Sequence, residues 1–209
     1  MRKRCALGLL LVLCRLLVAV PTLSAQEWDE GEWDDYNFDL YSPGDQTIVI
    51  SLGLIFPTVF VYSGGSVRAH NINPVGGAGS ISYNYHLGRH LFLGGEIGGS
   101  FNGTLAKNNL FIWNFGIRGG WQFFFGRFEF PVALAFGMAP QSYIGNGYLG
   151  IYLRGQASAF FRFNPEWSFG LNTDWTWYPQ RPVVDGRRRP DMDADGNFLG
   201  LTLAARYHF

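Results

Sequence analysis

Seven charged residues stand inside segments that otherwise consist of apolar and small residues, and they are the first candidates for chemistry. Arg154 and Asp174 belong to two neighbouring segments, and Glu96 and Arg118 to another neighbouring pair. An isolated charge away from water is costly, so such residues must be paired. The sequence therefore predicts an internal ion-pair network, which either gates a passage or only holds the fold together. Its members are Glu96, Arg118, Glu129, Arg154, Arg162, Asp174 and Arg206.

Alternating carboxylates near the C-terminal end suggest a metal site. Asp191, Asp193 and Asp195 precede Gly196, as in the first half of a calcium-binding loop, but the position expected to hold glutamate is Thr202. The run Arg187-Arg188-Arg189 stands just before these carboxylates. We expect either a weak Ca²⁺ site or a solvated loop tip with balanced charge, and the arginines are suited to contacting phosphate groups.

The sequence shows no clear arrangement of serine and histidine residues suited to covalent catalysis. His70 lies near Ser63 and Ser66 within one polar stretch, whereas the other histidines lie outside that stretch. A histidine in a polar loop is usually only solvated. We therefore expect no catalytic residues, no enzymatic activity and no cofactor apart from the weak Ca²⁺ possibility.

The elements that must position the charged residues are strands, because apolar residues recur at every second position. Leu91, Leu93 and Ile97, for example, alternate with Glu96 and neighbouring small residues. No window from Gln46 onward has a convincing helical period. The eight predicted strands are 47–60, 76–86, 90–101, 110–125, 128–138, 148–163, 167–177 and 198–209.

Short turns and long polar loops alternate between these strands, and the number of strands is even. Both features are typical of barrels that cross a membrane. A soluble sandwich or lipocalin-like barrel also alternates, but its apolar face must fit inside. Here that face carries too much Phe, Trp and Leu for an eight-stranded interior. We therefore predict an all-β, eight-stranded antiparallel up-and-down transmembrane barrel, with apolar side chains facing lipid.

The N-terminal 45 residues divide into two parts. Residues 1–25 run from a basic start through an apolar stretch to Ser24-Ala25, which predicts a cleaved signal peptide rather than an anchor. Both cysteines, Cys5 and Cys14, lie in it. Residues 26–45 form an acidic segment, and residues 46–209 form the barrel. Without the signal the chain has 12 basic and 16 acidic residues, a net charge of −4, which argues against a nucleic-acid partner.

Small residues dominate the face opposite the apolar one, including Gly94, Gly116, Gly137 and Ala133. A glycine-lined wall leaves room for a narrow cavity or water path. Alternatively, these residues relieve the curvature of the barrel and make room for larger side chains. The sequence leaves both interpretations open.

The last strand ends on an alternating apolar pattern with a terminal Phe, formed by Leu201, Leu203, Tyr207 and Phe209. This pattern resembles the assembly signal of bacterial outer-membrane proteins, and the chain resembles small barrels of the OmpW, OmpX and OmpA-barrel type. The resemblance implies outer-membrane lipid and the barrel-insertion machinery as partners, with both termini periplasmic. It also implies a narrow channel for passive passage of small, including apolar, molecules. The alternative is a closed barrel whose loops contact a host surface or lipopolysaccharide.

Overall fold

A computed structural model describes residues 41–62, 66–67, 72–104, 108–143, 146–181, 183–184, 187–188 and 193–209. The whole sheet lies within residues 39–209, which form one compact unit. Among the described residues, no helix is long and apolar enough to cross a membrane.

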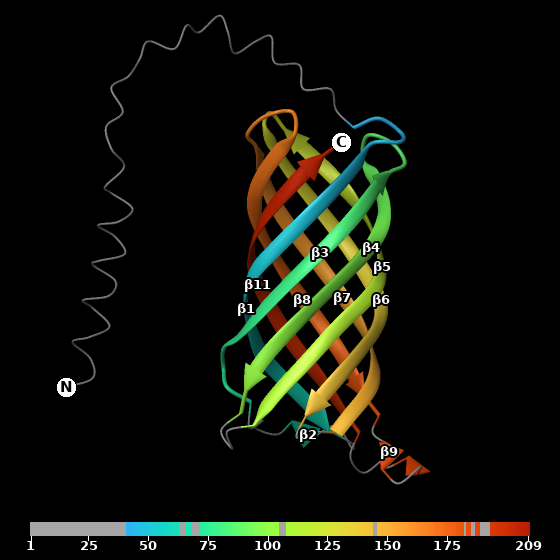
Figure 1. Cartoon of the computed structure of the whole chain (residues 1–209), viewed down its shortest axis with the longest axis vertical. Helices are drawn as coiled ribbons and strands as arrows, with labels where there is room; N and C mark the ends of the chain where they lie inside the picture. Colours follow the sequence, from blue (N-terminus) through green and yellow to red (C-terminus); the bar gives the residue numbers. More distant parts are fainter. Residues whose placement is uncertain are drawn as a thin grey trace, which may run out of the picture. The chain divides into compact units, whose positions relative to one another are not determined.

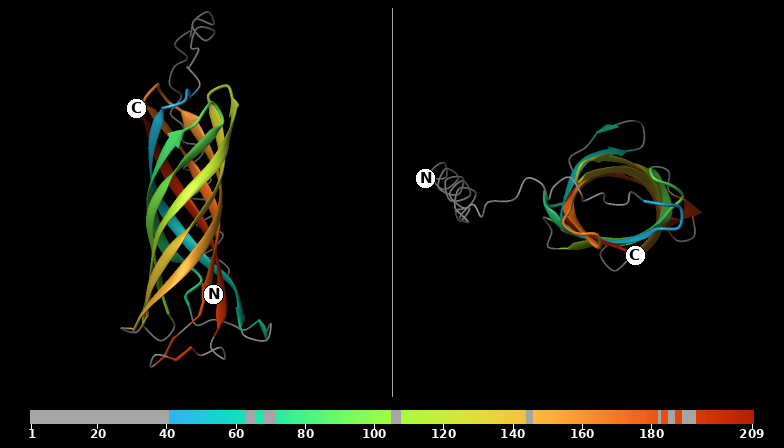
Figure 2. Two further views of the ribbon diagram at one scale, coloured as in Figure 1. Left: turned by 90° about the vertical axis from the view of Figure 1, so that its right-hand side faces the viewer. Right: turned by 90° about the horizontal axis from the view of Figure 1, so that it is seen from above.

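Eight long antiparallel strands form the sheet in the described part of the chain (Figure 1). Consecutive long strands pair with each other, and β1 also pairs with β11, so the sheet closes on itself. The end-on view in Figure 2 shows the resulting ring. This is the predicted up-and-down topology. The long strands are β1 (Gln46–Tyr62), β3 (Gly76–His86), β4 (Leu91–Gly103), β5 (Asn109–Phe125), β6 (Phe128–Tyr143), β7 (Asn146–Arg162), β8 (Trp167–Gln180) and β11 (Ala194–His208).

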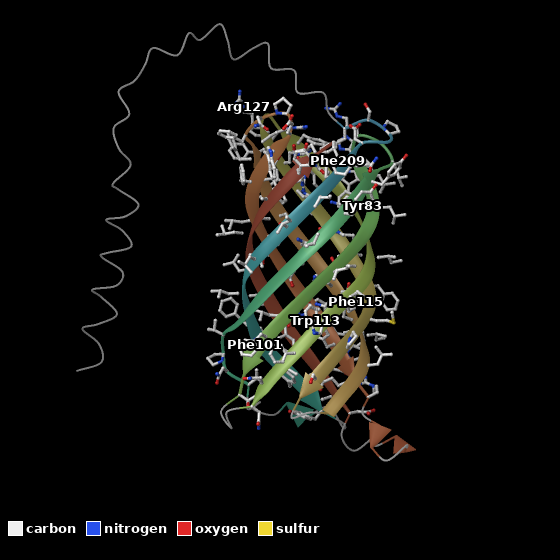
Figure 3. The ribbon with its side chains drawn as sticks, in the orientation of Figure 1. Tyr83, Phe101, Trp113, Phe115, Arg127 and Phe209 are labelled. Carbon is white, nitrogen blue, oxygen red and sulfur yellow. The ribbon has the colours of Figure 1, made fainter. Side chains whose placement is uncertain are left out.

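The prediction that apolar side chains point outward and charged side chains point into the barrel is confirmed. Successive side chains of a strand point to opposite sides, so one face of each strand lines the lumen and the other forms the outer surface. Leu134 is 65 % exposed and Ile117 is 68 % exposed, whereas the charged residues of the same strands are buried. In Figure 3, Phe101 and Phe115 project outward among the other apolar side chains. The apolar faces of the strands therefore form the outer surface, and the faces with the charged residues line the lumen.

The two ends of the barrel differ in their connections. Both Gln46 and Phe209 lie at the end with the short turns, where their backbones exchange hydrogen bonds of 3.0 and 3.1 Å. We call this end the terminal mouth. One of its turns contains Gly126, whose φ of +56° lets two strands reverse within a tight hairpin. Three of the four connections at the opposite, loop end are longer, as predicted, whereas the predicted loop 139–147 is reduced to the two residues between β6 and β7.

Several strands extend further toward the loop end than the sequence indicated. β6 continues to Tyr143, and the predicted loop 178–197 is shortened because β8 reaches Gln180 and β11 begins at Ala194. The cause is pairing between neighbours, which continues past the point where the apolar alternation fades. Three two-residue strands were also not predicted: β2 (Ser66–Val67), β9 (Val183–Val184) and β10 (Arg187–Arg188).

Side chains fill the lumen rather than leaving it hollow. Near the loop end, Phe60, Tyr152, Tyr178 and Phe198 are buried in one apolar cluster. Phe160 packs with Val49 and Ala204 in a second cluster. In an eight-stranded barrel the interior is just wide enough for such filling. The charged residues lie among these rings.

Candidate functional site: the barrel lumen

The first group of charges, which we call the central cluster, consists of Glu96, Arg154, Asp174 and Tyr152. Arg154 Nη1 donates to Glu96 Oε1 at 2.9 Å, and Arg154 Nε lies 3.7 Å from Asp174 Oδ2. The Tyr152 hydroxyl donates to the same Glu96 oxygen at 2.8 Å. Because β4 and β7 are not neighbours in the sheet, the contact between Glu96 and Arg154 spans the lumen. The cluster therefore braces opposite walls of the barrel.

The second group, the mouth cluster, is built around Glu129 near the terminal mouth. Glu129 accepts hydrogen bonds from Arg206 at 2.7 Å, Gln122 at 2.6 Å and the hydroxyl of Tyr41 at 2.9 Å. Arg162 Nη1 lies 3.4 Å from its other oxygen. Glu129 is buried, so one carboxylate compensates two buried guanidinium groups. This arrangement makes Glu129 the residue on which the cluster depends.

Arg118 lies between the two clusters. The sequence suggested that it pairs with Glu96, and this prediction is wrong. It donates to Ser82 Oγ at 2.6 Å and to Gln156 Oε1 at 3.1 Å. The register explains the difference, because Gly94 rather than Glu96 lies opposite Arg118 on the neighbouring strand. Arg118 is thus displaced from Glu96 along the barrel, and Glu96 pairs with Arg154 across the lumen instead.

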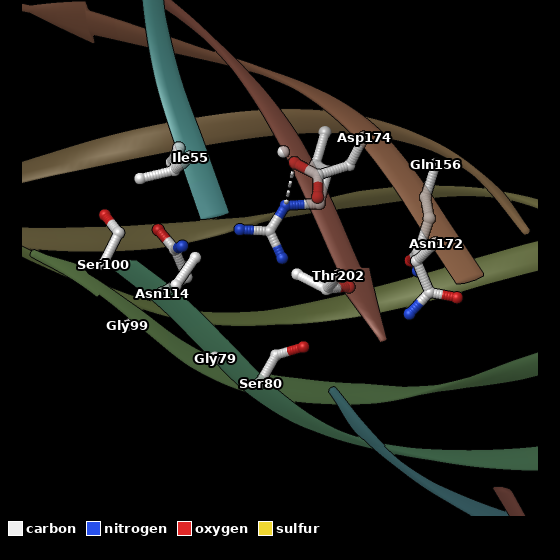
Figure 4. Close-up of a pocket in the computed structure, with 13 residues that line it drawn as sticks. Ile55, Gly79, Ser80, Gly99, Ser100, Asn114, Gln156, Asn172, Asp174 and Thr202 are labelled. Atoms are coloured by element: carbon white, nitrogen blue, oxygen red, sulfur yellow. Dashed lines mark ion pairs between the residues drawn. The ribbon is translucent and has the colours of Figure 1, made fainter. Parts of the chain in front are cut away.

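Two small cavities accompany these groups. One has a volume of about 30 Å³ and is lined by Asn114, Arg154, Asn172 and Asp174, among others. Figure 4 shows its polar lining and the ion pair between Arg154 and Asp174. The second, about 10 Å³, is bordered by Arg118 and other residues nearer the terminal mouth. Since a buried water needs roughly 10–15 Å³, the first space is large enough for about two waters and the second for at most one.

The inward glycines sit against neighbouring backbone. A methyl group added at Gly94 would meet the Tyr83 carbonyl, and one at Gly137 would meet the Phe115 carbonyl. At Gly116 an added methyl would meet both the hydroxyl of Tyr152 and the Phe136 backbone. These positions therefore allow close approach of curved strands and large side chains. The geometry favours the curvature interpretation over a glycine-lined passage.

Tyr41 was not predicted as part of the site, because it lies in the acidic segment and has no alternating neighbours. The structure buries it in the mouth cluster, where its ring stacks on His86 with centroids 3.8 Å apart. Loss of solvation on burial, with Glu129 nearby, raises the pKa of Tyr41 to about 12, although Arg206 opposes the shift. Tyr41 therefore belongs to the mouth cluster, although it lies before the predicted start of the barrel at residue 46.

A serine, a histidine and a carboxylate are connected near the terminal mouth. Ser168 Oγ lies 2.8 Å from His208 Nε2, and His208 Nδ1 lies 3.0 Å from the hydroxyl of Tyr41, which donates to Glu129. A nucleophile and its base have this pairing in hydrolases. However, Ser168 is 0 % exposed, so an incoming carbonyl group has no access to its oxygen. We interpret the chain of hydrogen bonds as structural.

The aspartates considered for Ca²⁺ are only partly described. Asp191 lies outside the described residues, as does the Ser63, Ser66 and His70 arrangement apart from the backbone of Ser66. Asp193 and Asp195 both contact Arg181, at 3.7 and 2.9 Å. No group of three or more His, Cys, Asp or Glu suited to a metal occurs among the described residues. The Ca²⁺ site stays a prediction.

The residues of the predicted assembly signal lie on the outer face of β11. Leu201, Leu203 and Phe209 are exposed, and Tyr207 is half-buried against Trp167, with ring centroids 4.9 Å apart. They form a continuous outward row that ends beside the start of β1. Recognition by an insertion machinery remains a prediction.

Comparisons with known proteins agree with this geometry. A protein-family model matches residues 26–207, and the chain belongs to the family that this model describes. The barrel superposes on Neisserial surface protein A with a TM-score of 0.57 at 12 % identity, covering 79 % of this chain and 97 % of that one. The chain is a small eight-stranded β-barrel of the outer-membrane type.

One further solved structure and one protein with a similar sequence extend the comparison. This outer-membrane-type barrel superposes on the outer membrane protein OprG of Pseudomonas aeruginosa with a TM-score of 0.50 at 8 % identity, covering 81 % of this chain and 97 % of that one. In sequence, it is 25 % identical over 178 residues to a Treponema pallidum (strain Nichols) protein described as an uncharacterized protein. That match covers 80 % of this chain and 78 % of the relative. These likenesses support the fold, whereas function must be argued from the lumen and surface.

Proposed function

We propose that the protein is a closed barrel in a bacterial outer membrane and that it acts through its long loops at the outer surface. The membrane location is supported by the outer surface, where large apolar side chains such as Leu52, Ile117 and Leu203 are exposed on every side of the barrel. Such a surface is stable against acyl chains and would aggregate in water. Short turns are typical of the periplasmic side, so the terminal mouth, where Gln46 and Phe209 lie, faces the periplasm in this proposal.

The observation that carries the proposal is the filling of the lumen. The central cluster joins opposite walls of the barrel, and the mouth cluster fills the lumen near the terminal mouth. Large aromatic rings such as those of Tyr152 and Phe160 are fully buried in the lumen as well. The cavities of about 30 and 10 Å³ are too small for a solute larger than water. This favours a closed barrel over the narrow channel that the sequence also suggested.

Planar-bilayer conductance of the purified, refolded protein tests closure. We expect no stepwise conductance and no uptake of small sugars into liposomes, under conditions in which a general porin reconstituted in parallel conducts. Reproducible single-channel steps from the unmodified protein would refute the closed barrel and restore passage of small molecules as the function.

Loop exchange tests the surface role. We expect that replacing residues 182–192, which include the three consecutive arginines, with a short Gly-Ser linker weakens adhesion of proteoliposomes to immobilised lipopolysaccharide. The matched control replaces residues 105–107, a loop with the single basic residue Lys107. Adhesion to host matrix proteins, measured in parallel, distinguishes a host surface from lipopolysaccharide. Adhesion that is unchanged by the exchange on every surface would contradict a contact role for this loop.

A further inference from the structure

The five residues before β1 form a turn across the terminal mouth, and we call residues 41–45 the mouth strap. The Ser42 amide donates to Asp45 Oδ2 at 2.7 Å, and the Asp45 amide donates to the Ser42 carbonyl at 3.2 Å. Gly44 has a φ of +106°, which few other residues adopt, and its amide donates to the His86 carbonyl at 2.9 Å. The strap is therefore an ordered turn fastened to the end of β3.

Tyr41 extends from the strap into the lumen. Its hydroxyl is 2.9 Å from Glu129, 3.0 Å from His208 and 3.2 Å from Arg206, which lie on β6 and β11. Its ring covers the imidazole of His86, and neither ring nitrogen of His86 has a hydrogen-bond partner in the structure. A buried polar group without a partner is costly. The stacked ring of Tyr41 thus keeps water away from the two ring nitrogens of His86, which water could otherwise hydrogen-bond.

Tyr41 borders one space at the terminal mouth and contacts residues that line a second, inner one. On the outer side, a pocket of about 200 Å³ at the terminal mouth is lined by Tyr41, Asp45, His208 and other residues of the rim. On the inner side, the cavity of about 10 Å³ is lined by His86, Arg118 and neighbouring residues, and Tyr41 does not border it. Tyr41 therefore lines the outer pocket and, through its contacts with His86 and Arg206, also packs against the wall of the inner cavity.

Closure of the barrel does not use the strap. The pairing of β1 with β11 begins at Thr47 and His208 and continues to Tyr62 and Ala194. The strap contacts the sheet through two backbone hydrogen bonds, from the Gly44 amide to the His86 carbonyl and from the His86 amide to the Asp45 carbonyl, and through the side chain of Tyr41. The ring of strands therefore closes without any pairing contributed by the strap.

We propose that the mouth strap is a removable lid: withdrawal of Tyr41 opens the terminal mouth and admits water as far as Arg118, while the barrel stays folded. The inference goes beyond the proposed function, because it does not depend on what the loops contact. The central cluster lies deeper than Arg118 and keeps the barrel closed to through-passage when the lid is open. Conductance and opening of the lid can therefore be measured separately.

Thiol accessibility in the full chain tests the lid, in a background with Cys5 and Cys14 replaced by serine. The reporter is Ser158→Cys, which lines the inner cavity, and the matched control is Ser100→Cys, which lines the 30 Å³ cavity beyond Arg118. We expect Tyr41→Ala to raise the rate of modification at position 158 by a small water-soluble thiol reagent at least tenfold. The rate at position 100 should not change, and Tyr41→Phe, which keeps the ring, should leave both rates low.

Each remaining outcome overturns the lid. An unchanged rate at position 158 in Tyr41→Ala shows that the ring does not close the mouth. Equal acceleration at positions 158 and 100 shows general loosening of the barrel. Loss of the heat-modifiable gel migration of the folded barrel shows that the strap is part of the fold and not separable from it.

Discussion

Neutralising Glu129 should be among the most damaging single changes to this barrel that keep the shape of the side chain. Glu129→Gln removes the carboxylate that holds Arg206 at 2.7 Å and Arg162 at 3.4 Å, and all three residues are buried. Breaking one buried ion pair by removing a partner typically costs about 3–5 kcal/mol, because a charge is left without compensation. The longer contact, between Glu129 and Arg162, contributes less to this cost. We therefore expect a loss of about 3–5 kcal/mol in the free energy of unfolding.

Equilibrium urea unfolding in lipid vesicles, followed by tryptophan fluorescence, measures this loss. The matched control is Glu166→Gln, the same chemical change at an exposed turn of the terminal mouth. There we expect a change within about 0.5 kcal/mol, as for surface substitutions in general. A cost for Glu129→Gln no larger than that of the control would refute the argument that one buried carboxylate compensates both arginines.

Three further predictions concern the wall, the outer surface and the strap. Gly94→Ala should destabilise the barrel by about 1–3 kcal/mol, because the methyl group meets the backbone of β3, whereas Gly77→Ala, with open space around it, should cost little in the same urea titration. Leu134→Arg should cost about 2–4 kcal/mol in a bilayer, more than Leu87→Arg in a short turn; equal costs would contradict lipid contact at position 134. Because its folded-state pKa of about 12 exceeds the ordinary value of 10.0, Tyr41 should stabilise the docked strap fully below pH 10 and lose this contribution as the pH rises toward 12. A difference ultraviolet titration against Tyr41→Phe checks this, and ionisation near pH 10 would contradict burial of the phenol.

The fold was predictable because a membrane barrel imposes one simple rule on every strand. Alternation such as Phe111, Trp113 and Phe115 against Asn114 and Gly116 places each residue on a face without knowledge of its neighbours. The turns followed from short polar interruptions. Strand ends were less predictable, since pairing rather than apolar pattern extends β6 to Tyr143.

The lumen was only half predictable for a physical reason. Strand order brings neighbours together, so Arg154 and Asp174 could be paired from the sequence, and they lie 3.7 Å apart. Contacts across the lumen depend on barrel diameter and on the stagger of strands, which the alternating pattern does not contain. The contact between Glu96 and Arg154 is of this kind. Arg118 was misassigned for the same reason, because its position relative to Glu96 depends on register.

The burial of Tyr41 could not be predicted from the sequence, for a different reason. A tyrosine among acidic residues has no periodic context, and its burial depends on a turn at Gly44 that leads the chain back over the barrel. The turn signal Ser42-Pro43-Gly44-Asp45 was visible in the sequence, but the direction of the turn was not.

The pairing of the first strand with the last has a consequence for biogenesis. Because β1 finds its second partner only in β11, the growing chain carries two unsatisfied sheet edges until β11 has been synthesised. Contacts between such distant parts of a chain form slowly, and open edges invite pairing with other chains. A polypeptide with this connectivity can pair with its own copies until the ring closes, and removal of β11 would leave an unclosed ribbon prone to aggregation.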